Sequence, residues 1–493
     1  MPRRPLLAAI AVLALSLPLA PVHGQDAGVS ERLESWYAAA RRTSPGTWGV
    51  VVADQEGQVL WSVNADEPMV PASTVKLLTT GFARTRVGAD ARRSTRVLGT
   101  GRLDTETGAW LGSWALELNG DPTLERPSVA GPTLASLAQQ LRLIGVRKLT
   151  GALALTSEAG EPTARYPSAW SPRHQGRYFA PPVGPITLNE NIVGFVVGPG
   201  SAPGAPAVLR TEVPSGIAGL ITIEATTVTG SRTRLAARRD GRGWIVTGTI
   251  GSRAAPKGWT FVAHDPSAVV GAVWSRALWS AGIDWDIDGP IQREADQTPR
   301  VLAEIASPPF DSIAHEINTR SVNIGAELLL AWAGGTARNA PQQLERHVRE
   351  VTGMASGIRL VDGSGLSDND RIAPRVFTTY LANFPRTSAG RDFPLLLPAN
   401  GSGTLKSLAS GLPEPGVVRA KTGTLGNAVT LVGYLGRQEG MLLVAVMYNG
   451  SRLTPARQKQ WELFRTLGAD GVVIPASSEV EVALGGSPAS EAR

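Results

Sequence analysis

The 493-residue chain contains no cysteine and only five histidines. Without cysteine it can form no disulfide, no thiolate metal site and no lipid-modified N-terminal cysteine. The sequence also lacks the Gly-x-Ser-x-Gly turn of α/β-hydrolases and the His-Glu-x-x-His signature of zinc hydrolases. These absences argue against a Ser-His-Asp hydrolase and against metal-dependent hydrolysis, and we expect no cofactor.

Lysine is also scarce, supplying six of the 48 basic residues. Two of the six stand in the short motifs Ser73-Thr-Val-Lys76 and Lys421-Thr-Gly-Thr424. Arginine does not lose its proton in a protein, whereas desolvation and neighbouring cations can shift the pKa of a lysine from about 10.4 towards 7. The use of lysine in these motifs therefore points to chemistry that needs an amine able to lose its proton.

Long apolar runs are absent after the first 24 residues. Those residues carry Arg3 and Arg4, an apolar run from Leu6 to Leu19 and a small-residue cleavage site at Val22-His-Gly24, as secretory signals do. The run is shorter than the roughly 20 residues of a membrane span, so a transmembrane helix is the weaker interpretation. We therefore expect a signal peptide over residues 1–24 and an exported, soluble chain without a transmembrane anchor.

The formal net charge is +6, and it falls to +4 if Arg3 and Arg4 leave with the signal. This mild excess suits loose association with an anionic wall or membrane surface. It does not indicate nucleic-acid binding, because no basic run is long. The length of the chain predicts two or three packed domains.

Segments from the two ends of the chain predict one antiparallel sheet. A short helix around residues 30–42 precedes two apolar runs, 48–53 and 58–63, that flank a glycine turn as in a β-hairpin. The simplest architecture is an α+β fold in which helices flank a sheet built from both chain ends, with the rest of the chain inserted between them. The strands expected near the C-terminus are 416–424, 429–435 and 441–448, followed by a helix over 455–467.

The middle of the chain, from about Ser94 to Pro290, is rich in Gly, Pro, Thr and Val. Alternating stretches at 220–226 and 243–249 predict short strands of a β-rich insertion. Helical segments at 267–282 and 305–334 are then expected to return the chain to the main domain.

The first motif places a serine and a lysine three residues apart. Ser73 follows an extended segment and opens a periodic run that predicts a buried helix. Residues three apart share a helix face, so the Lys76 amine can lie beside the Ser73 hydroxyl as a base beside a nucleophile. The positive potential of a helix N-terminus would favour the alkoxide. Because Ser-x-x-Lys also arises by chance on solvated faces, the motif alone leaves the two interpretations about even.

The second motif is Ser321-Val-Asn323, ahead of a helical run. A tight turn that leads into a helix can present a hydroxyl and an amide together, to relay a proton and to hold the lysine and the substrate. Serine and asparagine are also favoured helix caps. Without the other motifs the cap is the stronger interpretation.

The third motif, Lys421-Thr-Gly-Thr424, lies on a predicted strand. Gly423 would leave room for a substrate backbone to pair with the strand edge, and the lysine and threonines offer a polar clamp for a carboxylate. An edge strand that carries a protective charge is the alternative. Each motif alone is weak, whereas the ordered set on a helix, a turn and a strand is much stronger.

Together the motifs resemble those of the penicillin-recognising serine acyltransferases: Ser-x-x-Lys, Ser-x-Asn and Lys-Thr-Gly. Ser73 and Ser321 lie 248 residues apart, far more than compact serine β-lactamases allow. Three further stretches make the chain similar to the class C low-molecular-mass penicillin-binding proteins of the penicillin-binding protein 4 type, from about residue 50 to 467. These stretches are Asn119-Gly-Asp-Pro-Thr-Leu124, Tyr178-Phe-Ala-Pro-Pro182 and Asp362-Gly-Ser-Gly-Leu-Ser367.

This resemblance implies a serine-type D-Ala-D-Ala carboxypeptidase and endopeptidase acting on peptidoglycan peptides, with β-lactams as covalent inhibitors. Ser73 would be the acylated nucleophile and Lys76 its general base. Ser321 would relay the proton, and Asn323 would orient the peptide. A periplasmic location also follows from the family, not from the residues.

The third motif would bind the terminal carboxylate of the substrate through Lys421, Thr422, Gly423 and Thr424, with Lys421 remaining charged. The backbone N–H groups of Ser73 and Thr424 would form the oxyanion hole, and loss of such a donor costs roughly 2.7–4 kcal/mol.

The family also implies a transpeptidase-like serine peptidase domain interrupted by two inserted domains. We expect the peptidase domain at 25–93 and 291–475, inserted domain II at 94–188 and 253–290, and inserted domain III at 189–252. A Ser/Ala/Glu-rich tail, 476–493, is expected to be disordered.

The sequence departs from the family at three places. Thr156 stands where an aspartate often helps to bind the diamino acid of the stem peptide, which puts that recognition in question. Val322 replaces a frequent aspartate, and Gly184-Pro-Ile186 replaces a small-residue stretch. These changes affect specificity more than acylation.

Two alternatives stay open. A β-lactamase or esterase of the same superfamily is weakened because no tyrosine has an asparagine two residues on, as the Tyr-x-Asn variant of the second motif requires. A non-catalytic wall-binding protein is disfavoured because all three motifs are intact and a pure binder has no use for a lysine of low pKa.

Overall fold

The computed structural model describes residues 24–127, 131–291, 298–335 and 339–474. The predicted tail at 476–493 and the predicted signal peptide lie outside these residues, except for Gly24, where helix α1 (Gly24–Thr43) begins. Of the helices within the described ranges, none has the length and apolar character to cross a bilayer.

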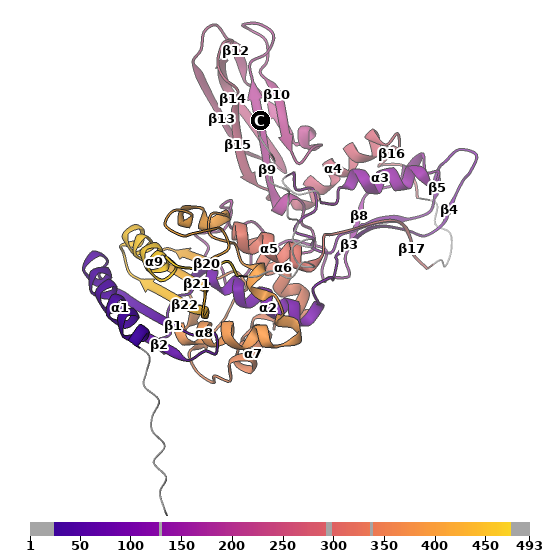
Figure 1. The fold of residues 1–493 in the computed structure, drawn as a ribbon. Helices are drawn as coiled ribbons and strands as arrows, with labels where there is room; N and C mark the ends of the chain where they lie inside the picture. Colours follow the sequence, from indigo (N-terminus) through magenta and orange to yellow (C-terminus); the bar gives the residue numbers. More distant parts are fainter. Residues whose placement is uncertain (1–23, 128–130, 292–297, 336–338, 475–493) are drawn as a thin grey trace, which may run out of the picture.

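A five-stranded antiparallel sheet forms the centre of the main domain, with the strand order β2-β1-β22-β21-β20 (Figure 1). Strand β1 pairs with β22 from Thr47 opposite Asn449 to Ala53 opposite Leu443, so the two chain ends meet inside one sheet. This confirms the predicted fold. The strands are β1 (Thr47–Ala53), β2 (Val59–Val63), β20 (Val418–Leu425), β21 (Ala428–Arg437) and β22 (Gly440–Asn449).

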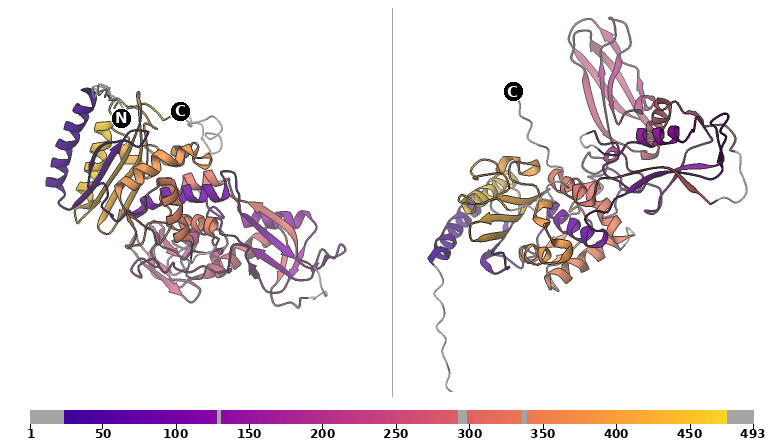
Figure 2. Two further views of the ribbon diagram at one scale, coloured as in Figure 1. Left: turned by 90° about the horizontal axis from the view of Figure 1, so that it is seen from below. Right: turned by 45° about the vertical axis from the view of Figure 1, so that its right-hand side comes forward.

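Helices cover both faces of this sheet (Figure 2). On β1, Val50 and Val52 pack in the core under α1 and α9 (Leu453–Leu467), whereas Val51 packs in the core on the opposite face. This alternation follows from the period of two along a strand, and it explains why β1 is buried on both faces. The helices of the opposite face are α2 (Val75–Val87), α5 (Phe310–Arg320), α6 (Asn323–Gly334), α7 (Ala340–Thr352) and α8 (Pro374–Asn383). A two-stranded ribbon, β18 (Ile358–Arg359) and β19 (Arg371–Ile372), joins α7 to α8.

The predicted helical segment 305–334 is wrong in its first part. Strand β17 (Arg300–Ala306) continues to Ala306, and the helical part is divided into α5 and α6. Between them Ser321 has a φ of 61°, in the left-handed region, which ends α5 and redirects the chain. The break places the second motif at the junction of two helices.

The first inserted region contains a four-stranded sheet with the order β17-β3-β6-β8 and two helices, α3 (Leu134–Leu143) and α4 (Pro266–Ser280) (Figure 1). Because β17 pairs with β3, we propose that this domain extends past the predicted boundary at residue 290 to about Ala306. Its remaining strands are β3 (Ser94–Gly99), β4 (Arg102–Leu103), β5 (Trp110–Leu111), β6 (Trp114–Glu117), β7 (Lys148–Thr150), β8 (Ala154–Thr156) and β16 (Asp284–Asp286).

The second inserted region is a lobe of two small sheets that projects from the body of the molecule (Figure 1). The predicted strands near 220–226 and 243–249 are present as β11, β12 and β14. Strand β15 pairs with β9, so a boundary at residue 252 would divide a sheet, and we propose a boundary after Val262 instead. The strands are β9 (Ile192–Gly198), β10 (Val208–Val213), β11 (Ile221–Ile223), β12 (Thr226–Val228), β13 (Thr233–Asp240), β14 (Gly243–Gly251) and β15 (Lys257–Val262).

Candidate active site

Ser73 lies on a single 3-10 turn, η1 (Ala72–Thr74), directly before α2. Its predecessor Ala72 has a φ of 50°, in the left-handed region that residues with a Cβ rarely adopt. The Ala72 carbonyl oxygen packs so closely on Gly365 that an added Cβ there would lie 1.9 Å from it. The sequence predicted that Ser73 opens the helix. Instead α2 begins at Val75, and the turn before it, buried at Ala72 and Thr74, presents the half-buried Ser73 at the helix N-terminus.

The Lys76 amine connects the first motif to the second. Its Nζ donates to Ser73 Oγ at 3.0 Å, to Asn323 Oδ1 at 2.6 Å and to the carbonyl oxygen of Ser364 at 2.6 Å. Its side chain is fully buried. Three acceptors from three segments of the chain therefore fix the position of the amine against the serine hydroxyl.

Burial lowers the pKa of Lys76 to about 7, although the charges of Asp362, Glu327 and Asp370 oppose this shift. A lysine with such a pKa has a substantial neutral fraction near neutral pH. A neutral amine in hydrogen-bond contact with a serine hydroxyl can accept its proton. The arrangement is therefore chemically competent for nucleophile activation.

Three buried carboxyl groups, those of Glu327, Asp362 and Asp370, form the electrostatic surroundings of Lys76. Glu327 Oε1 accepts the backbone N–H of Gly363 at 3.1 Å, and Asp362 Oδ1 accepts that of Ser364 at 3.1 Å. Burial and the neighbouring Asp362 charge raise the pKa of Glu327 to about 8 and the pKa of Asp370 well above its usual range. These three acids therefore fix the turn that contains Ser364, whose carbonyl oxygen accepts a hydrogen bond from Lys76 Nζ.

Sequence reasoning missed Glu327 and Asp370, and it quoted Asp362 without a role. A signal for Glu327 was present, because it follows Asn323 by four residues and so lies on the same face of α6. Asp370 gave no such signal. Its link to the site depends on the fold of the turn between β18 and β19, where its Oδ1 accepts the N–H of Val361 at 2.8 Å.

The second motif uses its side chains for the site and not for capping. Asn323 is the first residue of α6, yet its Oδ1 accepts from Lys76 and its Nδ2 donates to the carbonyl oxygen of Phe179 at 2.8 Å. Ser321 ends α5 through its backbone, and its Oγ accepts from Lys421 Nζ at 2.9 Å. The hydroxyl and the amide thus reach the lysines of the first and third motifs.

Lys421 lies on β20, the edge strand of the central sheet, with a fully buried side chain. Besides Ser321, its amine contacts the carbonyl oxygen of Thr422 at 2.8 Å. Burial lowers the pKa of Lys421 well below its usual range, and the cations Lys76 and Arg457 lower it further. Lys421 is expected to be charged when it binds a carboxylate: burial opposes that charge, and an arriving carboxylate would favour it.

The residues of the third motif do not all face the same way. Side chains alternate along a strand, so Lys421 and Gly423 share one face of β20 while Thr422 and Thr424 share the other. Thr422 is nearly buried, whereas Thr424 is exposed and its Oγ1 accepts from Arg457 Nη2 at 3.1 Å. Sequence reasoning missed Arg457, because its connection to Thr424 crosses from helix α9 to the sheet.

Gly423 marks a close approach between β20 and the nucleophile's turn. An added Cβ there would lie 3.0 Å from the Ser73 backbone nitrogen, 2.8 Å from the Pro71 oxygen and 2.1 Å from Thr430 Oγ1. The sequence had assigned this glycine to a passing substrate backbone. The structure gives a different reason: the missing side chain lets the Ser73 N–H and the edge of β20 lie side by side.

One wall of the site comes from an inserted region. Trp170 and Ala180 pack with Leu366 and Leu425 in a small apolar cluster, against which Phe179 also lies. The neighbouring Tyr178 is 75% exposed. In the sequence, the segment around Tyr178 was notable only for its likeness to the family. The structure joins this segment to Asn323 through the Phe179 carbonyl.

Thr156, which stands where the family often has an aspartate, ends strand β8, and its Oγ1 is buried without a hydrogen-bond partner.

Within the described ranges no cluster of three or more histidine or acidic side chains could hold a metal ion.

Comparisons with known proteins identify one matching family, similar sequences and a similar fold. A family model described as the D-Ala-D-Ala carboxypeptidase 3 (S13) family matches residues 30–465. The chain is 28% identical over 428 residues to a D-alanyl-D-alanine carboxypeptidase of Actinomadura sp. (strain R39), covering 82% of this chain and 77% of that protein. It is 22% identical over 405 residues to D-alanyl-D-alanine carboxypeptidase DacB of Haemophilus influenzae, covering 80% and 83%. Its fold is similar to the crystal structure of penicillin binding protein 4 from H. influenzae, with a TM-score of 0.69 at 21% identity over 87% of this chain and 98% of that one.

Proposed function

The chain belongs to the D-Ala-D-Ala carboxypeptidase 3 (S13) family and is a serine-type carboxypeptidase, and from this premise we propose that it cleaves peptidoglycan stem peptides through an acyl-enzyme on Ser73. One observation carries the proposal: the buried Lys76 amine lies 3.0 Å from the Ser73 hydroxyl, with a pKa lowered to about 7 by burial.

In the first step, Ser73 Oγ attacks the carbonyl carbon between the two D-alanines while its proton passes to Lys76. The negative charge that develops on the carbonyl oxygen is held by the backbone N–H groups of Ser73 and Thr424, and the close approach of β20 to the Ser73 nitrogen, which leaves no room for a Cβ on Gly423, supports this pairing. Collapse of the intermediate breaks the peptide bond, leaves an ester on Ser73 and releases D-alanine.

The leaving amine needs a proton, and we propose that the Ser321 hydroxyl delivers it. Its hydroxyl lies 2.9 Å from Lys421 Nζ, while Asn323 connects Lys76 to the carbonyl oxygen of Phe179. Water then attacks the ester, and Lys76 acts as the base once more. In this scheme the proton that Lys76 took from Ser73 reaches the leaving amine through the Ser321 hydroxyl, so Lys76 is neutral again before water attacks. The proton that Lys76 then takes from water returns to Ser73 Oγ as the ester bond breaks.

The terminal carboxylate is proposed to bind at the edge of β20. Lys421 is one of the residues that would bind it. The carboxylate supplies a counter-charge, which offsets the effect of burial on the pKa of the Lys421 amine. Thr424 is exposed and offers its hydroxyl, whereas Thr422 and Gly423 shape the strand. The same contacts would hold the carboxylate of a β-lactam, so we propose that β-lactams acylate Ser73.

Cleavage of D-Ala cross-links by the same site and export to the periplasm also belong to this proposal. The test is the product pattern from defined muropeptides. Wild-type protein should release D-alanine from a pentapeptide monomer and convert a cross-linked dimer to monomers, while Ser73→Ala should do neither. Retained peptidoglycan binding with no turnover by the wild-type protein would favour a non-catalytic wall-binding protein.

A further inference from the structure

Arg457 on α9 reaches across the sheet to the third motif. Its Nη2 donates to the carbonyl oxygen of Gly423 at 2.5 Å and to Thr424 Oγ1 at 3.1 Å. Its Nη1 donates to the carbonyl oxygen of Thr430 at 2.8 Å and to Gln460 Oε1 at 2.6 Å. The guanidinium therefore binds both strands of the β20–β21 pair at the level of the site.

The contact with Gly423 falls on a particular peptide group. The carbonyl of Gly423 and the N–H of Thr424 belong to one planar amide, so the two point in opposite directions. Arg457 binds the oxygen end of this amide, and the N–H end is the proposed oxyanion donor. Hydrogen bonds polarise one another in series, and an ionised donor is roughly twice as strong as a neutral one. A cation on the oxygen thus makes the N–H a better donor.

The guanidinium of Arg457 is held by neutral groups. In the part of the chain that the structure describes, no carboxylate forms an ion pair with it, and its hydrogen-bond partners are two carbonyls, a hydroxyl and an amide. Burial lowers the pKa of Arg457 to about 10, which leaves it protonated at neutral pH. The ring of Trp461 lies 5.2 Å beneath it. Because its acceptors are neutral, the half-buried guanidinium keeps a positive electrostatic potential around Thr424. This potential would stabilise a negative charge that develops beside the Thr424 N–H.

We infer that Arg457 is a positioning residue for acylation: it fixes and polarises the Gly423–Thr424 peptide as an oxyanion donor and holds the Thr424 hydroxyl towards the substrate carboxylate. This inference rests on the proposed function, because it assumes that the Thr424 N–H receives the oxyanion. It assigns to α9, a helix otherwise placed as cover for the sheet, a direct influence on the reaction.

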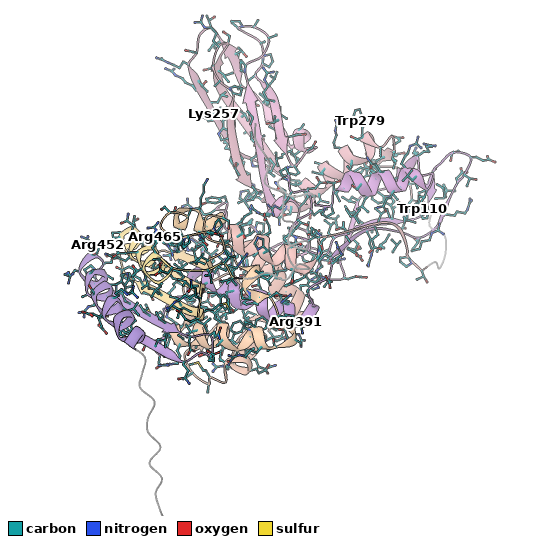
Figure 3. The ribbon with its side chains drawn as sticks, in the orientation of Figure 1. Trp110, Lys257, Trp279, Arg391, Arg452 and Arg465 are labelled. Carbon is teal, nitrogen blue, oxygen red and sulfur yellow. The ribbon has the colours of Figure 1, made fainter. Side chains whose placement is uncertain are left out.

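A purely structural role is the alternative, since Arg457 also joins α9 to two strands. The two roles differ in what they change. A purely structural contact affects the free energy of unfolding, whereas polarisation of the Thr424 N–H affects the stretching frequency of the ester carbonyl in the acyl-enzyme. Arg465 provides a matched comparison: it lies on the same helix (Figure 3) and joins α9 to the carbonyl oxygens of Ser410 and Ser407 at 2.7 and 2.9 Å, away from the third motif.

The experiment compares Arg457→Gln, Arg457→Lys and Arg465→Gln in the full-length protein. For each, the second-order rate of acylation by a penicillin is measured, and the acyl-enzyme formed with a 13C-carbonyl penicillin is examined by infrared difference spectroscopy. We expect Arg457→Gln to acylate about tenfold more slowly, less than the 100-fold or greater loss from removing an oxyanion donor outright. Its ester carbonyl stretch should move to higher wavenumber.

Arg457→Lys keeps the charge but lacks the planar set of donors, so its acylation rate and carbonyl wavenumber should lie between those of wild type and Arg457→Gln. It also replaces Arg457→Gln in the comparison if that variant does not fold. Arg465→Gln should match wild type in rate and wavenumber. A wild-type wavenumber in both Arg457 variants would overturn the inference. Labelling of Ser73→Ala would instead overturn the proposed function, whereas an unlabelled Ser73→Ala with wild-type behaviour of Arg457→Gln would overturn the role of Arg457 alone.

Discussion

Lys421 Nζ lies 2.9 Å from Ser321 Oγ, and this hydrogen bond joins the buried lysine of the third motif to the half-buried serine of the second. The amine fits between the hydroxyl and the Thr422 carbonyl. A guanidinium is larger, cannot become neutral and directs its donors in a plane. The geometry therefore explains why the motif has lysine in a chain that otherwise prefers arginine.

Lys421→Arg should lower kcat/KM for a D-Ala-D-Ala peptide by about tenfold or more, because the larger group displaces Ser321 from its path to the leaving amine. Steady-state kinetics on a pentapeptide measure this. Lys406→Arg on an exposed 3-10 turn is the matched control and should leave kcat/KM unchanged. Full activity of Lys421→Arg would show that the position requires a positive charge and nothing more.

The pH dependence of acylation should report Lys76. Because the neutral amine is the base and burial lowers its pKa to about 7, kcat/KM should fall about tenfold per pH unit below 7 and level off above it. Acylation rates between pH 5 and 9 provide the measurement, with thermal unfolding at each pH to exclude loss of fold. A rate that is flat between pH 5 and 8 contradicts the assignment of Lys76 as the base.

Glu327 should act as a hydrogen-bonding acid in its neutral form. Burial raises its pKa to about 8, so the carboxyl is mostly protonated at neutral pH and Glu327→Gln should stay within about twofold of wild-type acylation at pH 7. Glu327→Leu removes the acceptor for the Gly363 N–H and should cost about 1–3 kcal/mol of unfolding free energy. Denaturant unfolding separates the two variants. Equal stability would mean that the Gly363 contact contributes nothing.

Gly423→Ala should slow acylation strongly, because the added Cβ meets Thr430 Oγ1 at 2.1 Å and the Ser73 nitrogen at 3.0 Å. Combining it with Thr430→Ala removes the conflict with Thr430 Oγ1 but leaves the added Cβ 3.0 Å from the Ser73 nitrogen and 2.8 Å from the Pro71 oxygen. The double variant should therefore regain part of the unfolding free energy without regaining the acylation rate. Recovery of both together would indicate that the close approach of β20 to Ser73 has no catalytic importance.

The sequence predicted those parts of the molecule that depend on local patterns. Spacing of three residues placed Lys76 beside Ser73, and alternating runs placed the strands of the central sheet, because the pairing of helix and strand faces follows from short-range geometry. The left-handed conformation of Ala72 left no mark on the sequence, because glycine is the residue that usually signals it.

Relationships that depend on the folded chain were the ones missed. The carboxyl groups around Lys76 and the guanidinium over the Gly423–Thr424 peptide come from segments far apart in the sequence. The inserted-domain boundaries that we propose to move depend on such pairing as well, since β15 and β17 pair with strands about 60 and 200 residues earlier. The composition of a segment predicts its secondary structure but not the distant strand with which it pairs.

The most direct test of the central claim is covalent labelling by a penicillin, followed by mass analysis of the modified peptide. Wild-type protein should gain one penicilloyl group on the peptide that carries Ser73, and Ser73→Ala should gain none. Lys76→Met should be labelled far more slowly at pH 7, because the hydroxyl then lacks its base. Labelling of Ser73→Ala at the wild-type rate, or a modified residue elsewhere in the chain, would contradict the account.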